Sequence, residues 1–242
     1  MSKVAVVTGA SKGIGRACAI RLAQDGYTVV VNYSSSDAAA EEVVNTIKAE
    51  GGEAVAYKAD VSDLDAVKKM FREIGKQFGQ IDVLVNNAGI SHFGLITDMT
   101  PKEWRNIMSI NLDSVFYTSK HATKLMLKEH RGHIINISSV WGNVGASLET
   151  AYSASKGAVN SFTKAMAKEL APSGIAVNAI ACGIIDTDMN GHLSPDELQA
   201  VVDEIPADRM GTPDEIGQMV LSIIDAPSYM TGQIITVDGG WT

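Results

Sequence analysis

A tyrosine and a lysine, Tyr152 and Lys156, stand four residues apart in a run rich in alanine and serine. In a helix, residues at i and i+4 share one face and lie about 6 Å apart along the axis. A free phenol has a pKa of about 10, and a fixed cation nearby lowers it towards the working range. We interpret Tyr152 as a candidate general acid whose pKa Lys156 lowers, although such a pair alone is more often two solvated neighbours.

Two further polar residues are placed to assist this pair. Ser139 follows the apolar run 132–138, and a strand ending there would deliver its hydroxyl to the ligand side of a sheet. That hydroxyl could donate to a carbonyl oxygen, or serve only as a cap or turn. Asn111 lies inside 101–129, which we expect to be one continuous helix, where a buried amide is structural or anchors a water molecule.

A glycine-rich turn precedes the first predicted helix. Residues 8–15 read Thr-Gly-Ala-Ser-Lys-Gly-Ile-Gly, directly after an apolar run. Glycines in a strand–turn–helix unit let the backbone approach a pyrophosphate at the amino end of the helix. The alternative is a glycine turn that binds no ligand. The candidate cofactor-binding residues of this turn are Gly9, Ser11, Lys12, Gly13, Ile14 and Gly15.

The end of the second apolar run bears on the choice of cofactor. An acidic residue there would accept a hydrogen bond from the ribose 2′-hydroxyl of NAD, but Asn32, Tyr33 and Ser34 occupy these positions, and the first acid is Asp37. Lys12 can supply positive charge nearby, which favours NADP(H). The alternative is that Lys12 is a solvated charge and the pocket accepts either cofactor.

Two later strand ends complete the predicted cofactor site. After the third strand, Asp60 either caps the next helix or accepts from an adenine amino group, and Val61 follows it. After the fourth strand, the Asn-Asn-Ala-Gly sequence can tie strands together and border the cofactor. Its candidate contacts are Asn87, Ala88 and Gly89.

Apolar runs of strand length alternate with amphipathic stretches along the chain, and the runs are apolar throughout rather than alternating. This pattern predicts an α/β fold, a doubly wound (Rossmann) parallel sheet of about seven strands with helices on both faces, in one domain spanning 1–242. Strands are predicted at 3–8, 27–33, 53–59, 81–86, 132–138, 174–180 and 233–237. Helices are predicted at 13–25, 37–50, 63–78, 101–129, 152–171 and 213–226.

Composition excludes several classes of protein. The formal charge of −8 over 242 residues, without a cluster of basic residues, argues against a nucleic-acid partner. No apolar run is long enough to span a membrane, and the amino terminus lacks the features of a signal peptide, so we expect a cytoplasmic protein. Cys18, Cys182 and the five histidines (His92, His121, His130, His133 and His192) show no ligand spacing, so we expect no metal site.

Taken together, these motifs resemble the short-chain dehydrogenase/reductase family over essentially the whole chain. The family's cofactor pattern matches Thr8 to Gly15, its Asn-Asn-Ala-Gly matches Asn86 to Gly89, and its Tyr-x-x-x-Lys matches Tyr152 to Lys156. The serine and asparagine of its catalytic tetrad match Ser139 and Asn111. The resemblance implies an NAD(P)-dependent oxidoreductase acting on alcohols or ketones.

The resemblance also implies roles for the tetrad. Tyr152 would protonate the carbonyl oxygen while Ser139 polarises it. Lys156 would lower the tyrosine pKa and bind the nicotinamide ribose, and Asn111 would hold a water molecule that links Lys156 to solvent. A non-catalytic NADP sensor on the same fold is the alternative, and the intact tetrad argues against it.

Other segments are similar to parts of the family pattern. Gly183, Ile185 and Thr187 match the loop that contacts the nicotinamide, in which Cys182 stands where proline is usual. Residues 188–206 are expected to form a substrate lid of short helices. The resemblance further implies a homotetramer.

Within the family the chain is most similar to 3-oxoacyl-acyl-carrier-protein reductases of fatty acid biosynthesis. Those enzymes often carry arginines where His130 and Ser173 stand here, although Arg131 could serve, and they carry glutamine in place of Glu149. A carboxylate in the pocket would suit a cationic or polyhydroxylated substrate, unless Glu149 faces solvent.

The segment from Ser139 through Trp141 to Tyr152 is also similar to reductases of aminopentanone-modified elongation factor P, whose substrate carries an amine. The substrate-binding candidates are therefore Ser139, Trp141, Glu149 and Tyr152. They would bind a ketone that is either a small molecule or attached to a carrier or protein.

Overall fold

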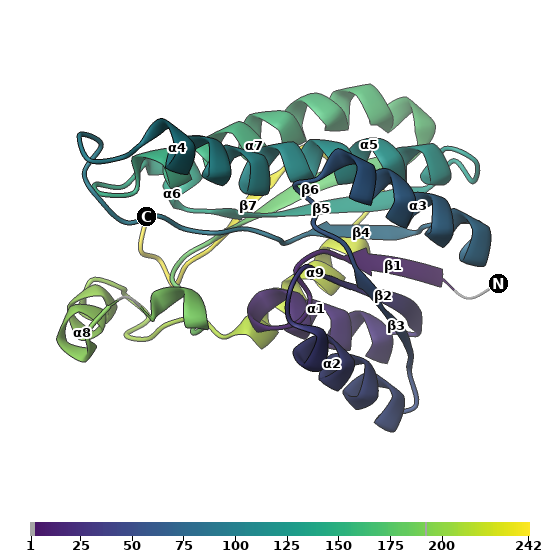
Figure 1. Cartoon of the computed structure of the whole chain (residues 1–242), viewed down its shortest axis with the longest axis horizontal. Helices are drawn as coiled ribbons and strands as arrows, with labels where there is room; N and C mark the ends of the chain where they lie inside the picture. Colours follow the sequence, from purple (N-terminus) through teal and green to yellow (C-terminus); the bar gives the residue numbers. More distant parts are fainter. Residues whose placement is uncertain (1–2, 192) are drawn as a thin grey trace.

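Seven parallel strands form one sheet in the order β3-β2-β1-β4-β5-β6-β7 (Figure 1). The computed structural model describes residues 3–191 and 193–242. This sheet confirms the predicted doubly wound α/β class, and the strand order reverses between β1 and β4. The strands are β1 (Lys3–Val7), β2 (Tyr27–Tyr33), β3 (Glu53–Lys58), β4 (Val83–Asn86), β5 (Gly132–Ser139), β6 (Ile175–Cys182) and β7 (Ile234–Val237).

Helices cover both faces of the sheet, as the apolar strands require. Every residue of β2 and of β4 is buried, which is why neither strand shows the alternation of a half-exposed sheet. The helices and helical turns are α1 (Gly13–Gln24), α2 (Asp37–Ala49), α3 (Leu64–Phe78), α4 (Pro101–Met108), η1 (Ser109–Asp113), α5 (Ser114–Met126), α6 (Trp141–Val144), α7 (Thr150–Leu170), η2 (Ala171–Ser173), η3 (Asp188–Asn190), α8 (Pro195–Asp203) and α9 (Pro213–Ile224).

The core consists of one hydrophobic cluster on each face of the sheet. Side chains of α1, α2 and α9 pack on one face, and those of α3, α5 and α7 pack on the other. Figure 1 shows these two helical layers above and below the strands. The two layers bury the sheet and leave its strand ends accessible.

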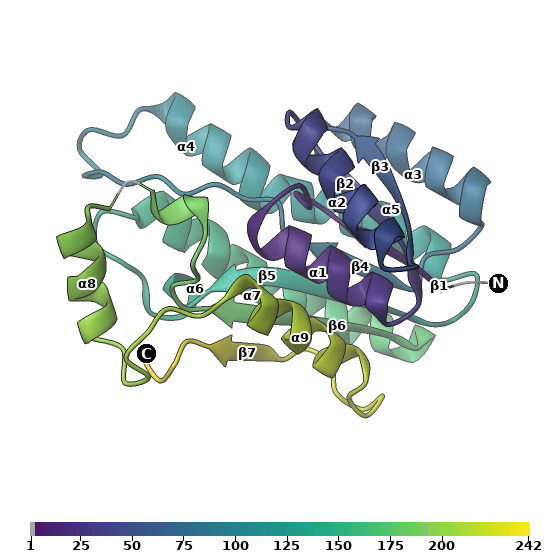
Figure 2. The ribbon, with the colours of Figure 1, turned by 90° about the horizontal axis from the view of Figure 1, so that it is seen from below.

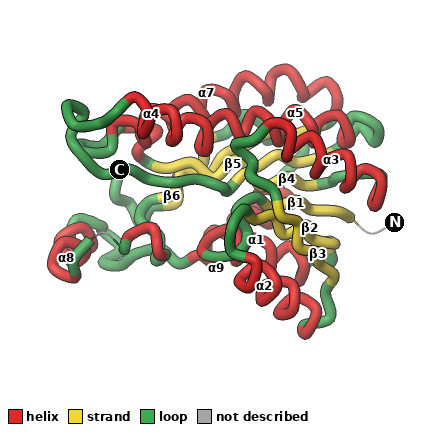
Figure 3. Tube along the Cα trace, viewed as in Figure 1, coloured by secondary structure: helices red, strands yellow, loops and turns green. Residues whose placement is uncertain are grey.

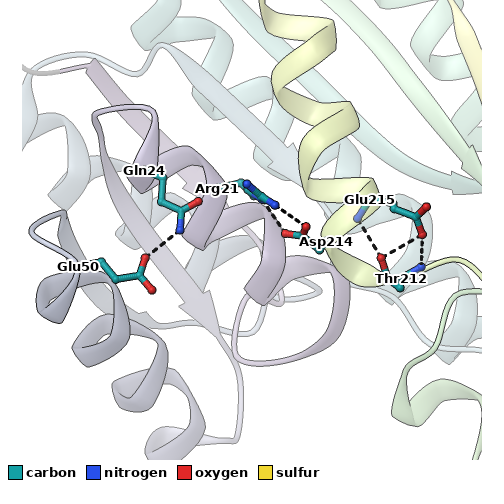
Figure 4. A network of polar contacts seen from close by, with 6 residues as sticks. All are labelled: Arg21, Gln24, Glu50, Thr212, Asp214 and Glu215. Carbon is teal, nitrogen blue, oxygen red and sulfur yellow. Dashed lines mark hydrogen bonds and ion pairs between the residues drawn. The ribbon is translucent and has the colours of Figure 1, made fainter.

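Helix α9 is held against α1, the helix that opens at the glycine turn (Figure 4). Arg21 on α1 donates to Asp214 on α9, with Nε and Oδ1 2.6 Å apart. A Cβ on Gly217 would lie 3.0 Å from the Ala17 carbonyl oxygen, so the two helices approach at a residue without a side chain. Thr212 and Glu215 form a capping box that starts α9. These contacts fix the position of α1 and therefore of the glycine turn.

The predicted helix over 101–129 is continuous, but it differs from the structure in its geometry and in its end. The chain is helical from Pro101 to Met126 and passes through a π-helical segment, Ser109–Asp113. Side-chain hydroxyls compete for the backbone here: Ser114 Oγ donates to the Ile110 carbonyl, and Thr118 Oγ1 to the Ser114 carbonyl at 2.7 Å. The other predicted elements agree with the structure to within two residues, and α6 was not predicted.

The carboxyl ends of the strands and the 188–206 segment meet at one end of the molecule. Figure 2 shows α8 and the C-terminal residues together at the end towards which β7 points. Figure 3 shows loops on both sides of α8, consistent with the short-helix lid expected for 188–206. Ligands of open α/β sheets bind at this end.

Candidate active site

The predicted acid and its lysine lie in the first two turns of α7. The helix begins at Thr150, so Tyr152 and Lys156 are one turn apart. Their exposed fractions are 9% and 5%. The Lys156 Nζ lies 5.6 Å from the centroid of the Tyr152 ring. Both groups therefore face the interior rather than solvent.

Ser139, the last residue of β5, lies against Tyr152. Its hydroxyl lowers the pKa of the phenol, against the effect of burial, and accepts from the backbone N–H of Trp141 at 3.2 Å. A serine oxygen that accepts in this way still carries its own proton. Ser139 can therefore donate to an oxygen atom that enters beside Tyr152.

The expectation that Lys156 lowers the pKa of Tyr152 is wrong for this structure. Burial raises the pKa of Tyr152 above its ordinary value, and the hydrogen bond with Ser139 only partly opposes this. Burial also lowers the pKa of Lys156 to about 8. The Lys156 Nζ donates to the Ile137 carbonyl at 2.8 Å. A phenol with a raised pKa stays protonated at neutral pH, which is the form that a proton donor needs.

Asn111 lies in the π-helical segment. Its Nδ2 donates to the Ile90 carbonyl at 2.9 Å and to Ser155 Oγ at 3.1 Å, and its Oδ1 accepts from the Ile90 N–H at 2.8 Å. A Cβ on Gly89 would lie 3.4 Å from the Asn111 Oδ1 and 3.5 Å from the Lys156 Nζ. The space beside Gly89 therefore borders both polar groups, as a bridging water molecule would require. Short π segments are frequent at functional sites.

The turn before α1 leaves room for a ligand against the backbone. Gly9 and Gly13 have φ angles of +60° and +55°, which residues with a Cβ adopt only at a cost. Lys12 occupies the N-cap position of α1 without a side-chain cap. The first N–H groups and the positive end of the helix dipole therefore suit an anion such as a pyrophosphate.

Gly15 plays a different part from the other glycines. It is buried, and a Cβ there would lie 2.4 Å from the Gly9 carbonyl oxygen and 2.5 Å from Asn87 Nδ2. Gly15 does not line the cavity described below. Its lack of a side chain lets α1 pack against the turn and against the loop after β4.

Hydrogen bonds join the glycine turn to the loop after β4. Thr8 Oγ1 accepts from the backbone N–H groups of Asn87 and Ala88 at 2.9 and 3.0 Å. Asn87 Nδ2 donates to the Thr8 and Gly9 carbonyls, both at 3.0 Å. One residue earlier, Asn86 donates to Asn136 of β5 at 2.9 Å. The asparagines therefore tie strands together, as expected, and hold the turn beside the loop.

These segments enclose a cavity of about 340 Å³. It runs from the glycine turn past the ends of β2 and β3 to the loop after β4. Its lining includes most of the residues predicted to bind a cofactor: Gly9, Ser11, Lys12, Gly13, Ile14, Asn32, Tyr33, Ser34, Asp60, Val61, Asn87, Ala88, Gly89 and Thr187. The cavity suits a dinucleotide, because glycine backbone, an uncapped helix end and small polar side chains line it.

Some of the residues expected to contact the cofactor ribose already form hydrogen bonds within the protein. Asn32 lines the cavity, but its Nδ2 donates to the Tyr57 and Ala59 carbonyls at 3.2 and 3.0 Å. The Asn32 side-chain amide is therefore bonded to the segment at the end of β3. Ser34 and the serines after it remain as donors.

The nearest acid, Asp37, is engaged away from the cavity. It accepts from the Tyr33 hydroxyl at 2.9 Å and from Lys58 Nζ at 2.8 Å, and both bonds hold its pKa below the ordinary value. Lys12 Nζ lies 3.1 Å from Asp188 in a solvent-exposed ion pair, which holds the lysine only weakly. The Asp37 carboxylate therefore does not line the cavity at this end, whereas Lys12 does.

The structure excludes the interpretation of Asp60 as the cap of the next helix. Asp63, not Asp60, is the N-cap of α3 and accepts from the N–H groups of Asp65 and Ala66. Asp60 Oδ1 accepts from the N–H and hydroxyl of Ser62 at 2.9 and 2.7 Å. Asp60 lines the cavity and is not the helix cap.

A second cavity of about 520 Å³ opens from the first. Both are lined by Ile14, Asn87, Gly89, Thr187 and Met189, so they are continuous. The predicted substrate-binding and catalytic residues Ser139, Trp141, Glu149, Tyr152 and Lys156 line the second cavity, with Gly183 and Ile185. Among the predicted site residues, Asn111 and Gly15 line neither cavity.

Cys182 lines this second cavity together with Tyr152 and Lys156. Burial raises the pKa of its thiol to about 12, against the influence of Lys156. A protonated, buried thiol is a weak nucleophile. Cys182 therefore acts as an apolar part of the wall at the start of the loop that contains Gly183, Ile185 and Thr187.

Glu204 and Trp241 also line the second cavity, and the sequence did not predict either of them as a site residue. The Trp241 ring meets the Trp141 ring edge-on at a centroid distance of 4.8 Å. Trp241 Nε1 donates to Glu204 Oε2 at 3.3 Å. Glu204 ends α8 and Trp241 follows β7, and only the folded chain brings these segments to α6. The one signal in the sequence was the position of Glu204 in the predicted lid.

Arg131, considered as a substitute for an arginine that grips a carrier, precedes β5 at the opposite end of that strand from Ser139. Its Nη2 lies 3.2 Å from Asp82 Oδ1. His130 and Ser173 lie at the same end, before β5 and β6. Within the described part of the chain, none of the three lines the second cavity.

Within residues 3–191 and 193–242, no group of three or more His, Cys, Asp or Glu side chains could hold a metal ion. His192, one of the five histidines in the sequence, lies outside the described residues. No helix in the described part of the chain is long and apolar enough to cross a membrane.

Comparison with known proteins decides the family. The model for short chain dehydrogenases matches residues 3–198. The chain belongs to the short-chain dehydrogenase family. This family membership makes the protein an oxidoreductase with a nicotinamide cofactor, which the glycine turn and the continuous cavities fit.

Several curated members of the short-chain dehydrogenase family align with nearly the whole chain. A 3-oxoacyl-acyl-carrier-protein reductase FabG of Staphylococcus aureus is 46% identical over 241 residues, covering 99% of this chain and 98% of the relative. A 3-oxoacyl-acyl-carrier-protein reductase of Synechocystis is 45% identical, covering 99% and 96%. The uncharacterized oxidoreductase YmfI of Bacillus subtilis is 40% identical over 243 residues, covering 100% and 99%.

Proposed function

We propose that this protein reduces a ketone to a secondary alcohol with NADPH, in the manner of a 3-oxoacyl-acyl-carrier-protein reductase. The observation that supports this best is the convergence of Ser139, Tyr152 and Lys156 on one cavity that adjoins the cavity at the glycine turn. The names of the relatives support the same class of reaction.

In this proposal the bound cofactor supplies a hydride to the carbonyl carbon. Ser139 donates a hydrogen bond to the carbonyl oxygen, and Tyr152 transfers its proton to that oxygen as the C–O bond becomes single. Lys156 is positioned by the Ile137 carbonyl to interact with the cofactor ribose and with the phenolate that remains. A water molecule beside Asn111 and Gly89 would return a proton from solvent.

The preference for NADPH over NADH rests on the charge near the end of β2. Asp37 is bound to Lys58 and Tyr33, and Lys12 is held only by an exposed ion pair. Lys12 and the serines that follow Tyr33 are the proposed contacts of a 2′-phosphate.

Turnover of a ketone panel with NADPH and NADH tests the proposal, comparing the wild-type protein with Tyr152→Phe. Removal of the general acid is expected to lower kcat/KM by about 10²- to 10⁴-fold, with the dissociation constant of NADPH little changed. NADPH is expected to support faster turnover than NADH. Absence of hydride transfer to every ketone would favour the alternative of a non-catalytic NADP sensor. Equal turnover by the two proteins would exclude the assigned role of Tyr152.

Glu149 favours a second substrate for the same chemistry. Its position on the cavity wall, three residues before Tyr152, supports an amine-bearing ketone such as aminopentanone-modified elongation factor P. A plain 3-oxoacyl thioester would place only apolar or neutral atoms beside this carboxylate.

We also propose a cytoplasmic homotetramer, from the resemblance to family members. Exposed aromatic residues on α4 and α5 support an association surface: Trp104 and Phe116 are 38% and 43% exposed. Fractionation of cells tests the location, and a membrane-bound protein would refute it. The tetramer is tested at the whole-molecule scale below.

A further inference from the structure

Two indole side chains form part of the wall of the second cavity. Trp141 and Trp241 both line this cavity, and neither lines the cavity at the glycine turn. Their rings meet edge-on, with centroids 4.8 Å apart and an angle of 62° between the ring planes. Edge-to-face contact is a favourable arrangement of aromatic rings. We call these two side chains the indole wall.

Trp141 places the indole wall close to the site of the reacting carbonyl. It follows Ser139 by two residues, and its backbone N–H donates to the Ser139 hydroxyl at 3.2 Å. Trp141 opens α6, which lies against α7, because a Cβ on Gly142 would lie 2.8 Å from the carbonyl carbon of Lys156. The wall is therefore fixed to the same backbone that carries the catalytic serine and lysine. A substituent of a ketone bound at Ser139 lies within a few bonds of it.

A tight turn after β7 fixes the backbone of Trp241. The Asp238 carboxylate accepts from the Gly240 N–H at 2.9 Å, and from the N–H and hydroxyl of Thr242 at 2.8 and 3.1 Å. Gly239 and Gly240 have φ angles of +70° and +86°, which residues with a side chain rarely adopt. Bonds on both sides of Trp241 therefore hold its backbone in one position.

The lid segment holds Trp241 from the other side. The Gly239 carbonyl accepts from the Ala207 N–H at 3.1 Å. Trp241 Nε1 donates at 3.3 Å to Oε2 of Glu204, the C-cap residue of α8. Figure 2 shows α8 and the C-terminal residues together at this end of the molecule. The indole is thus held by its backbone, by its Nε1 and by the ring of Trp141, and it cannot move aside for a ligand without losing these contacts.

A fixed apolar wall limits the length of a chain that enters the cavity. Each methylene that the cavity buries adds to binding until the chain reaches the wall. The next methylene must then displace a packed ring or leave the cavity, and well-packed sites accept extra methylenes poorly. We propose that Trp241 is a specificity-determining residue that sets the length of the aliphatic arm of the ketone substrate. The substrate class is that of ketones with a short, unbranched arm.

This inference rests on the proposed ketone reduction and adds the length of the substrate arm. It does not depend on the charge of the substrate, because both indoles are neutral. Trp241→Ala removes one indole and its hydrogen bond to Glu204, and it leaves Trp141 in place. Space then opens at this side of the cavity for a longer arm, which makes the proposal testable with a homologous series.

The experiment uses 3-oxoacyl thioesters of N-acetylcysteamine whose acyl arm grows by one methylene at a time, from methyl to nonyl. The value of kcat/KM with NADPH is measured for the wild-type protein, Trp241→Ala and Trp241→Phe. Trp104→Ala is the matched control, because it removes a 38% exposed indole of α4 that does not line the second cavity.

For the wild-type protein, kcat/KM is expected to rise about fourfold with each methylene up to a limiting arm length and then to fall. Trp241→Ala should move this limit to longer arms. Relative to an arm below the limit, it should raise kcat/KM for the first arm beyond the limit about 4- to 16-fold, the range of one to two buried methylenes. The smaller ring of Trp241→Phe should give an intermediate limit, and Trp104→Ala should keep the wild-type limit. Comparing arms within one protein cancels any general effect of a substitution on folding or on cofactor binding.

A limiting length that is the same in the wild-type protein and in Trp241→Ala would overturn the inference. So would a wild-type kcat/KM that rises along the whole series without a limit. Calorimetric binding of the matching 3-hydroxyacyl thioesters to the NADPH complex separates this inference from the proposed function, because these alcohols cannot react with NADPH. A length limit in binding that Trp241→Ala moves, without turnover of any ketone, would support the role of Trp241 and refute the ketone reduction.

Discussion

Among single residues, Lys156 combines nearly complete burial with a pKa lowered to about 8. The pKa of a lysine in the unfolded chain is about 10.4. Between these values the unfolded chain binds more protons than the folded one, so this residue makes the free energy of unfolding rise with pH. We predict that the wild-type protein gains about 1–3 kcal/mol of stability relative to Lys156→Met between about pH 8 and pH 10.5.

Urea unfolding midpoints at several pH values measure this difference. Lys164→Met, which removes an exposed lysine from the same helix, is the control and should run parallel to the wild-type protein across the range. A difference between wild type and Lys156→Met that does not vary with pH would mean that the buried ammonium group keeps its ordinary pKa.

The sequence predicted which side chains could react better than it predicted the pKa values of those side chains. The spacing of Tyr152 and Lys156 and the strand-end position of Ser139 made these residues candidates, and the resemblance to the family selected them. The direction of the Tyr152 pKa shift was not predictable, because it depends on burial and on where the Lys156 Nζ points. Likewise, only the folded chain shows that the Asn32 amide donates to the carbonyls of Tyr57 and Ala59.

At the scale of elements, the packing of α1 depends on Gly15. A Cβ there would lie 2.4 Å from the Gly9 carbonyl, whereas a Cβ on Gly157 of α7 would lie 3.4 Å from the Gly142 carbonyl. We predict that Gly15→Ala lowers the free energy of unfolding by about 1–3 kcal/mol and weakens NADPH binding. Gly157→Ala should be neutral or stabilise by up to about 1 kcal/mol through helix propensity.

Thermal unfolding of both variants, with and without NADPH, measures these effects. If Gly15→Ala unfolds at the wild-type temperature and shows the same shift with NADPH, the glycine turn tolerates a side chain and the packing argument fails. Gly157→Ala shows whether a methyl group near the catalytic helix is harmful in itself.

Local patterns of apolar residues predicted the strands and most helices. Burial on both faces of a sheet and the helical period both show in residues that are close together in the sequence. They did not predict the π-helical segment, which depends on the bonds that Asn111 makes with Ile90 and Ser155. They also left open whether Asp60 caps α3, whereas the structure gives that place to Asp63, through bonds to the nearby N–H groups of Asp65 and Ala66.

For the whole molecule, the homotetramer proposed above makes a prediction about the exposed face of α5. Phe116 is 43% exposed, with the Lys120 Nζ 5.4 Å from its ring centroid. We predict that Phe116→Glu lowers the molar mass measured by light scattering after gel filtration, because it would bury a charge in an apolar contact. Tyr229→Ser, which changes a 99% exposed residue near β7, should leave the mass unchanged.

A wild-type protein that elutes as a monomer would refute the tetramer itself. A tetramer that survives Phe116→Glu would place the contact on another surface. The second cavity shows why such questions need the fold. Trp241 contacts both Trp141 and Glu204, and these three residues come from separate parts of the sequence.

The strand order has a consequence for how the chain acquires its structure. β1 lies in the middle of the sheet, between β2 and β4, and Val7 pairs with Val85 on its β4 side. During synthesis from the amino end, that edge of β1 has no partner until about eighty residues later in the chain have emerged. Parallel pairings of this range form slowly, and an unpaired apolar strand edge invites contact with other chains. The central position of β1 places the glycine turn beside the loop after β4. It therefore also makes the amino-terminal half of the nascent chain the part that depends most on rapid synthesis of the rest or on chaperones.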